Sequence, residues 1–353
     1  MKIIPLYISK SICIGLMIAG AIACARKPAP ITTGQNTKAG YRLISERQAR
    51  KWIIIDNKES FFDKVTPLEM SIQMKQNHKN IPREEVLEKY KKMLQDDLSE
   101  FTNEEKEIVK KLFDKALELC YQISPEINLP EIFLIKTKGH YYGSSVYYTR
   151  DNSIVIPAPM LNLGANLKNM SFLRTMIHEI FHIYSRYNKD KRDAMYKRIG
   201  FDKIPNLSLS DFLEKRVLYN PDGVDLRYSI NVKDSTGRTF KAIPVIYSKH
   251  NGYKETIPSF FSYLTFQLYE IRDRAGIWSV KNKDIGNSIE DLTGFWEQVG
   301  TNTKYNIHPD EICADNFVIM AFAKETEGKN LKDLTDEGRQ LVLDLETIIV
   351  GKQ

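Results

Sequence analysis

The chain is poor in histidine and cysteine: its 353 residues include six His and four Cys. Two of the cysteines, Cys13 and Cys24, lie near the N-terminus. The other two, Cys120 and Cys313, fall in segments that we expect to form unrelated helices. They can pair in an oxidising compartment or stay as buried thiols, and the sequence leaves both alternatives open.

The chain also lacks a basic stripe, an internal repeat and a heptad run. Its formal net charge is +6, and it becomes +4 without residues 1–23, whose only charged side chains are Lys2 and Lys10. Lysine and arginine alternate with acidic residues along the expected helices. We therefore expect no nucleic-acid partner.

One apolar run has the features of a targeting segment. Residues 12–23 are apolar, follow Lys2 and Lys10, and end in Ala-Ile-Ala before Cys24. The run is too short to span a bilayer comfortably, and its basic start and small-residue end are typical of a secretory signal peptide. A cysteine at this point resembles a bacterial lipobox, which implies a lipid such as palmitate on Cys24. An ordinary cleaved signal or an uncleaved anchor are the alternatives.

Composition divides the chain into four expected parts. Residues 1–23 are the signal peptide. Residues 24–40, rich in Pro, Thr, Gly, Lys and Gln, are a flexible tether. Residues 41–128 form a helical N-terminal region, and residues 129–353 form a second domain. The resemblance to lipoproteins implies an extracytoplasmic protein anchored to the outer membrane or the cell surface.

Hydrophobic periodicity predicts an α+β fold. Helices are expected at residues 45–57 and 67–79, from Pro82, from a capping box at Thr102, over residues 171–187, over the aromatic-rich residues 253–271, from Pro309, and over residues 335–349. Strands are expected at residues 132–136, in hairpins at 145–148 with 153–156, and at 228–232 with 239–247.

The most informative motif is His178-Glu179-Ile180-Phe181-His182. On a helix, residues four apart lie on one face, so both imidazoles can bind one Zn²⁺ while Glu179 leans toward a water on that ion. The surrounding helix is apolar on most sides, and buried polar groups are costly without partners. A pair of core histidines satisfied by hydrogen bonds is the alternative interpretation.

A second motif supplies the missing ligand. Glu311 and Asp315 lie four residues apart on the helix that Pro309 opens. Glu311 can be the third metal ligand, and Asp315 can hydrogen-bond the far nitrogen of a liganding histidine. Two histidines, one glutamate and an open fourth position are typical of a catalytic zinc site.

An HExxH helix followed by an ExxxD helix resembles the gluzincin, or thermolysin-like, zinc metallopeptidases. The resemblance implies that residues 129–353 are a zincin-like metallopeptidase domain with a small antiparallel sheet beside the HExxH helix. It also implies that an edge strand, here residues 147–150 or the neighbouring hairpin edge, binds the substrate backbone. An ordinary sheet strand is the alternative. The residues after His182 lack the Gly and third His of the metzincin pattern.

The expected reaction is hydrolysis of a peptide or protein substrate. Glu179 acts as general base toward a zinc-activated water and returns the proton to the leaving amine. Gluzincins add a Tyr or His that stabilises the oxyanion. Tyr253 is the candidate here, with Tyr247, His250 and His308 as alternatives. A non-catalytic binding lipoprotein and an amidase acting on cell-wall peptides are the rival functions.

Overall fold

This computed structural model describes residues 39–161, 165–281 and 284–351. The expected signal peptide, Cys24 and almost all of the tether lie outside these residues. The α+β class is confirmed. Residues Ala39–Gln353 form one compact unit.

The N-terminal part is largely helical. Its helices are α1 (Glu46–Trp52), α2 (Phe61–Lys64), α3 (Pro67–Gln73), α4 (Arg83–Asp96) and α5 (Asn103–Ile123). The predicted capping box is confirmed: the Thr102 side chain accepts from the Glu105 backbone, and the Glu105 side chain accepts from the Thr102 backbone. This reciprocal pair satisfies two backbone donors that the first turn of α5 would otherwise leave free.

A four-stranded sheet follows these helices. Its strands lie in the order β1 (Tyr41–Leu43), β2 (Ile132–Thr137), β4 (Ser153–Pro157) and β3 (Tyr148–Arg150). The hairpin of β3 and β4 was predicted, although β3 begins at Tyr148. The sheet is mixed rather than wholly antiparallel, because β2 pairs in parallel with both β1 and β4. The pairing of β1 with β2 ties the helical region into the same unit as the metal motifs.

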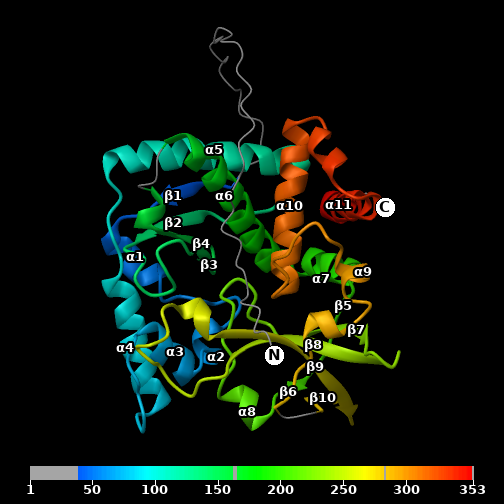
Figure 1. Ribbon diagram of the computed structural model, residues 1–353. Coiled ribbons are helices and arrows are strands. Elements are labelled where there is room, and N and C mark those ends of the chain that lie inside the picture. The colour runs from blue at the N-terminus through cyan, green and yellow to red at the C-terminus, as the bar shows by residue number, and fades with distance from the viewer. Residues whose placement is uncertain (1–38, 162–164, 282–283, 352–353) are drawn as a thin grey trace. The chain divides into compact units, whose positions relative to one another are not determined.

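Two long helices pack side by side in the core, and α5 contacts both (Figure 1). They are α6 (Ala165–Tyr187) and α10 (Pro309–Glu325), which carry the two predicted motifs. The Phe317 ring of α10 lies 5.2 Å from the Phe181 ring and stacks on Tyr184 at 6.4 Å. Phe181 and Phe317 are fully buried. This aromatic contact fixes the spacing of the two helices beside the motifs.

Two further helices, α7 (Lys189–Arg198) and α11 (Asp336–Val350), flank the core and contact α10. The remaining helices are short: α8 (Asp211–Glu214), α9 (Trp296–Val299), and 3-10 helices at Ala158–Leu161, Phe260–Tyr263, Ile289–Asp291 and Lys329–Asp333. None of the described helices has the length and apolarity that a membrane span requires.

A six-stranded sheet lies between the two motifs in sequence. Its order is β5 (Phe201–Lys203), β7 (Tyr228–Lys233), β8 (Thr239–Ser248), β9 (Leu264–Arg274), β10 (Ile277–Val280) and β6 (Leu207–Ser208). The predicted hairpin of β7 and β8 is confirmed. The predicted helix over residues 253–271 is wrong, because most of its second half is β9, paired antiparallel with β8.

Both described cysteines are free and buried, which agrees with the thiol alternative. Burial raises the pKa of Cys120 and Cys313. Cys120 lies on α5 and Cys313 on α10, and both belong to the core cluster that α6 shares. They fill space in that core.

Candidate metal centre

His178, Glu179 and His182 lie on the buried part of helix α6. Its neighbouring apolar residues Ile177, Ile180 and Phe181 have no exposed surface, so they hold the helix against the core. The rings of His178 and His182 lie 4.7 Å apart, as expected for residues one helical turn apart on one face. The predicted placement of the two imidazoles is therefore observed.

Helix α10 brings Glu311 to these imidazoles in its first turn. His308 is the N-cap residue: its ring Nδ1 accepts the backbone N–H of Asp310 at 3.1 Å. His308 therefore caps the N-terminus of α10. Capping sets where α10 begins, and so sets where Glu311 points.

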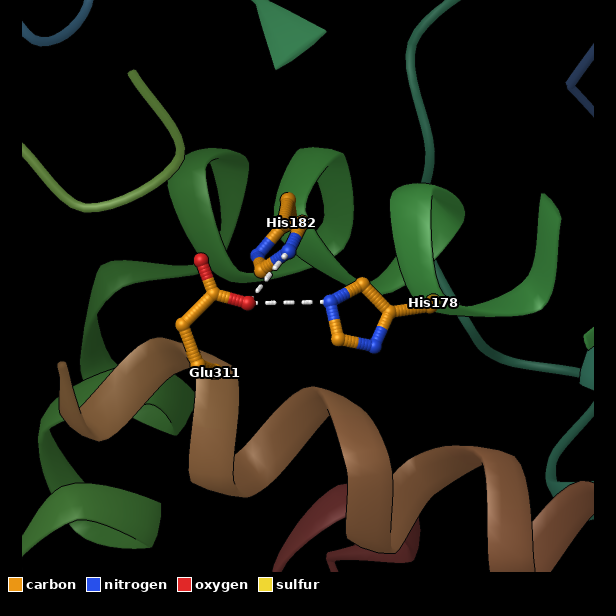
Figure 2. A group of neighbouring side chains, drawn as sticks. All are labelled: His178, His182 and Glu311. Atoms are coloured by element: carbon orange, nitrogen blue, oxygen red, sulfur yellow. Dashed lines mark hydrogen bonds and ion pairs between the residues drawn. The ribbon is translucent and has the colours of Figure 1, made fainter. Parts of the chain in front are cut away.

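Three side chains converge on one point (Figure 2). Glu311 Oε2 lies 3.0 Å from His178 Nε2 and 3.4 Å from His182 Nε2. Each residue offers one ligand atom, and these atoms lie within 4.8 Å of one another. Ligands about 2.1 Å from a tetrahedral ion are separated by about 3.4 Å. The donor set and its spacing therefore fit a metal ion.

The far nitrogen of each ring is held by a carboxylate. His178 Nδ1 lies 3.0 Å from Asp315 Oδ1, where the sequence predicted a partner for one of the two histidines. His182 Nδ1 lies 2.6 Å from Asp310 Oδ2. The sequence analysis missed Asp310, although it directly precedes Glu311. Such carboxylate–histidine pairs orient the ring and fix which nitrogen faces the ion.

The surroundings favour positive charge at this point. Burial by itself lowers the pKa of His178, but hydrogen bonds to Asp315 and Glu311 raise it to about 10. Burial also opposes protonation of His182, yet Glu311 and Asp222 hold its pKa well above the usual range. Conversely, the two histidines outweigh burial and lower the pKa of Glu311. A metal cation at this point would replace the protons on the two Nε2 atoms.

A turn between the two helices completes the site. Asn220 Nδ2 donates to Glu311 Oε1 at 2.6 Å, which fixes the carboxylate that faces the histidines. Asp222, two residues on, forms a second possible metal group with Glu179 and His182, again within 4.8 Å. Gly223 permits this approach, because a Cβ there would lie 2.1 Å from His308 Nδ1. In the sequence, Asn-Pro-Asp-Gly indicated only a turn.

Glu179 has a buried carboxylate oxygen without a hydrogen-bond partner among the described residues. The residue is 5 % exposed, and no described residue hydrogen-bonds its Oε2. Burial, and then repulsion from Asp222, raise the pKa of Glu179 to about 8. A buried carboxylate oxygen without a donor is costly unless a ligand uses it.

The structure does not bring Tyr253 to this cluster. The Tyr253 backbone bonds Asn77, and its ring packs beside the cluster of Leu68 and Ile72. Of the alternatives, Tyr247 donates to Gln267 at 2.7 Å, and His250 lies against Tyr263. A different tyrosine is close instead.

That tyrosine is Tyr305, in the segment before α10. Its ring lies 6.3 Å from the His178 ring, and the residue is 38 % exposed. The sequence analysis did not single it out. The sequence signal that could have identified Tyr305 was its position shortly before Glu311.

A cavity of about 70 Å³ opens beside the site. Seven of its fifteen lining residues are aromatic, including Tyr142, Phe260 and Tyr305, and most of the others are aliphatic; Asp222 is its acidic residue. Its mostly apolar lining with a few polar groups resembles that of ligand pockets, but its volume is well below the roughly 300–1,000 Å³ of a whole-ligand site, so it suits one chemical group.

The edge of β3 is covered beside this cavity. Asp222 Oδ1 accepts the Thr149 backbone N–H at 2.6 Å and the Thr149 hydroxyl at 2.5 Å. Arg186 donates to the Asp151 carbonyl at 2.9 Å. The expectation that residues 147–150 add a substrate strand needs correction at Thr149, because its outward N–H is already bonded.

Comparison of the chain with protein-family models, with curated proteins and with solved structures gave no match. The functional argument therefore starts from the geometry of this site.

Proposed function

We propose that the protein is a zinc metallohydrolase that cleaves peptide bonds. The observation that carries the proposal is the convergence of His178, His182 and Glu311, with the unpartnered carboxylate of Glu179 beside them. Two imidazoles and one carboxylate leave a tetrahedral ion one further position, and this donor set suits zinc in a catalytic role. Resemblance to the gluzincins in the same four residues supports the peptidase assignment.

Each residue has a distinct task in this proposal. When bound, zinc supplies a Lewis acid that polarises a carbonyl and acidifies a water. Glu179 takes a proton from the attacking water and passes it to the leaving amine. Its buried position and raised pKa suit a group that must both accept and release a proton near neutral pH.

Tyr305 replaces Tyr253 as the candidate for oxyanion stabilisation. Its ring lies beside His178, and the residue lines the adjoining cavity. Removing one hydrogen-bond donor to the developing negative charge costs about 10²–10³-fold in kcat at other hydrolytic sites. Tyr305→Phe removes that hydroxyl and keeps the ring.

The proposal includes the location inferred from the sequence. The pattern before Cys24 favours a lipid-anchored, extracytoplasmic protein. The protein would then act on peptide or protein substrates outside the cytoplasm. An amidase for cell-wall peptides would use the same groups.

The test is digestion of a mixed peptide library by the zinc-loaded protein, read by mass spectrometry. We expect cleavage that a chelator stops and added zinc restores. Glu179→Ala should abolish turnover with zinc still bound, whereas Glu104→Ala, at an exposed position on α5, should behave as wild type.

No cleavage by the zinc-loaded protein would favour a binding lipoprotein. Turnover that survives Glu179→Ala would show that another group moves the proton.

A further inference from the structure

One carboxylate oxygen of the turn residue Asp222 is hydrogen-bonded, and the other has no hydrogen-bond partner among the described residues. Its Oδ1 accepts both donors of Thr149. No described residue hydrogen-bonds or ion-pairs with its Oδ2. Arg186 lies close, but it donates to the Thr149 hydroxyl and the Pro221 carbonyl rather than to Asp222. The free oxygen is therefore available to a ligand.

This carboxylate lies next to the reacting groups. Asp222, Glu179 and His182 each place one ligand atom within 4.8 Å of the other two. Glu179 Oε2 is buried and unpartnered in the same space. Two such carboxylates side by side favour a cation between or beside them.

The cavity and the covered strand restrict what can bind. The cavity that Asp222 lines is small, and seven of its fifteen lining residues are aromatic. Aromatic faces attract an ammonium group, and a carboxylate pairs with it. Since Thr149 is already bonded, an extended peptide cannot continue along β3 at that position.

We propose that Asp222 binds the free amino terminus of a peptide, so that the enzyme removes the first residue as an aminopeptidase. This inference rests on the proposed function. The water oxygen bonds to the first carbonyl carbon, the bond from that carbon to nitrogen breaks, and the water proton goes to the leaving amine. The products are one amino acid and a peptide shortened by one residue.

Distance favours the amino terminus over a lysine side chain as the source of the cation. An α-ammonium is two bonds from the carbonyl carbon under attack, whereas a lysine ε-ammonium is six bonds away. One carboxylate oxygen of Asp222 lies within 4.8 Å of a ring nitrogen of His182. A group bound to Asp222 must therefore lie near the reacting carbonyl.

The test compares Leu-Ala-Ala-Ala amide, its N-acetyl form and N-acetyl-Lys-Ala-Ala-Ala amide on the zinc-loaded protein. A charge-assisted hydrogen bond contributes enough for about a 10–100-fold effect. We expect acetylation to lower kcat/KM by about that factor and the free peptide to lose residues singly from its amino end. Asp222→Asn should lower kcat/KM for the free peptide equally and remove the effect of acetylation.

Two controls keep the variant interpretable. Asparagine keeps an oxygen for the Thr149 N–H, so Asp222→Asn preserves that contact. Asp190→Asn, at an exposed position on α7, makes the same chemical change away from the cavity and should leave the acetylation effect intact.

Three outcomes would overturn the inference. Equal cleavage of free and acetylated peptides, at internal bonds, contradicts it while the proposed function stands. Efficient cleavage of the acetylated lysine peptide assigns the cation to the side chain.

If no peptide is cleaved, the proposed function fails. Calorimetry of peptide binding then tests separately whether Asp222 binds a free amino terminus. Zinc-loaded Glu179→Gln protein should bind the free leucine peptide about 10–100-fold more tightly than the acetylated one, and equal affinity is the third contrary outcome.

Discussion

Consecutive residues of α10 reach both ring nitrogens of His182. Asp310 Oδ2 lies 2.6 Å from its Nδ1, and Glu311 Oε2 lies 3.4 Å from its Nε2. Asp310 is itself fixed by hydrogen bonds from Ser185 and Tyr196. The first turn of α10 therefore sets the orientation of the ring and supplies the ligand opposite it.

This arrangement predicts that Asp310 and Asp315 differ in their effects. Asp315→Asn should lower zinc affinity about 10–100-fold and barely change the stability of the metal-free protein, because the Asp315 side chain is 34 % exposed. Asp310→Asn should lower affinity similarly and also destabilise the metal-free protein by about 1–3 kcal/mol, since the buried Nδ1 donor of His182 loses its acceptor. Competition with a chromophoric chelator and urea unfolding measure the two effects. Equal stability of the two variants would contradict the prediction.

Zinc affinity should rise with pH. The pKa of His178 is raised to about 10, above its ordinary 6.5, so at neutral pH the ion must displace a proton from Nε2. As pH increases toward that value, the competing proton is lost and binding strengthens. Calorimetry in buffers of different ionisation enthalpy should detect released protons. Affinity that is independent of pH between 6 and about 9 would contradict the predicted competition.

The contact between α6 and α10 should be essential for stability. Phe317→Ala removes a ring that is 1 % exposed and packs on Phe181 and Tyr184. It should lower the free energy of unfolding by about 3–5 kcal/mol. Leu343→Ala, at a position 42 % exposed on α11, should change it by less than about 1 kcal/mol. Similar losses in both variants would show that this contact is not special.

Membrane attachment should depend on Cys24. Cys24→Ser should abolish lipid labelling, and the chain should stay unprocessed or leave the membrane fraction. Mass spectrometry of the mature N-terminus tests this directly. A mature chain that begins at another residue would refute it.

The sequence predicted the two motif helices because their signals are local. Four-residue spacing places His178 with His182 and Glu311 with Asp315 on single helical faces, whatever the rest of the fold. That the two faces meet was inferred from resemblance, and the structure brings them together. Asn220, Asp222 and Asp310 were missed as site residues because nothing local marks a turn or a first helical residue as the neighbour of a distant histidine.

The error at residues 253–271 has a different cause. The aromatic content suggested a buried helix, but from Leu264 to Leu268 apolar and polar residues alternate, which favours a strand. Pairing of β9 with both β8 and β10 then determines the structure. Strand preference depends on such neighbours, which a single segment does not show.

The most direct test of the account is the zinc content of three purified proteins, measured by mass spectrometry after dialysis. We predict one zinc per chain for wild type and for Glu179→Gln, and a large loss for Glu311→Gln, because Glu311 faces both histidines whereas Glu179 stands beside them. Glutamine preserves size at both positions, so the comparison isolates the carboxylate. Wild-type protein without zinc, or Glu311→Gln protein that retains it as well as Glu179→Gln, would contradict the metal centre.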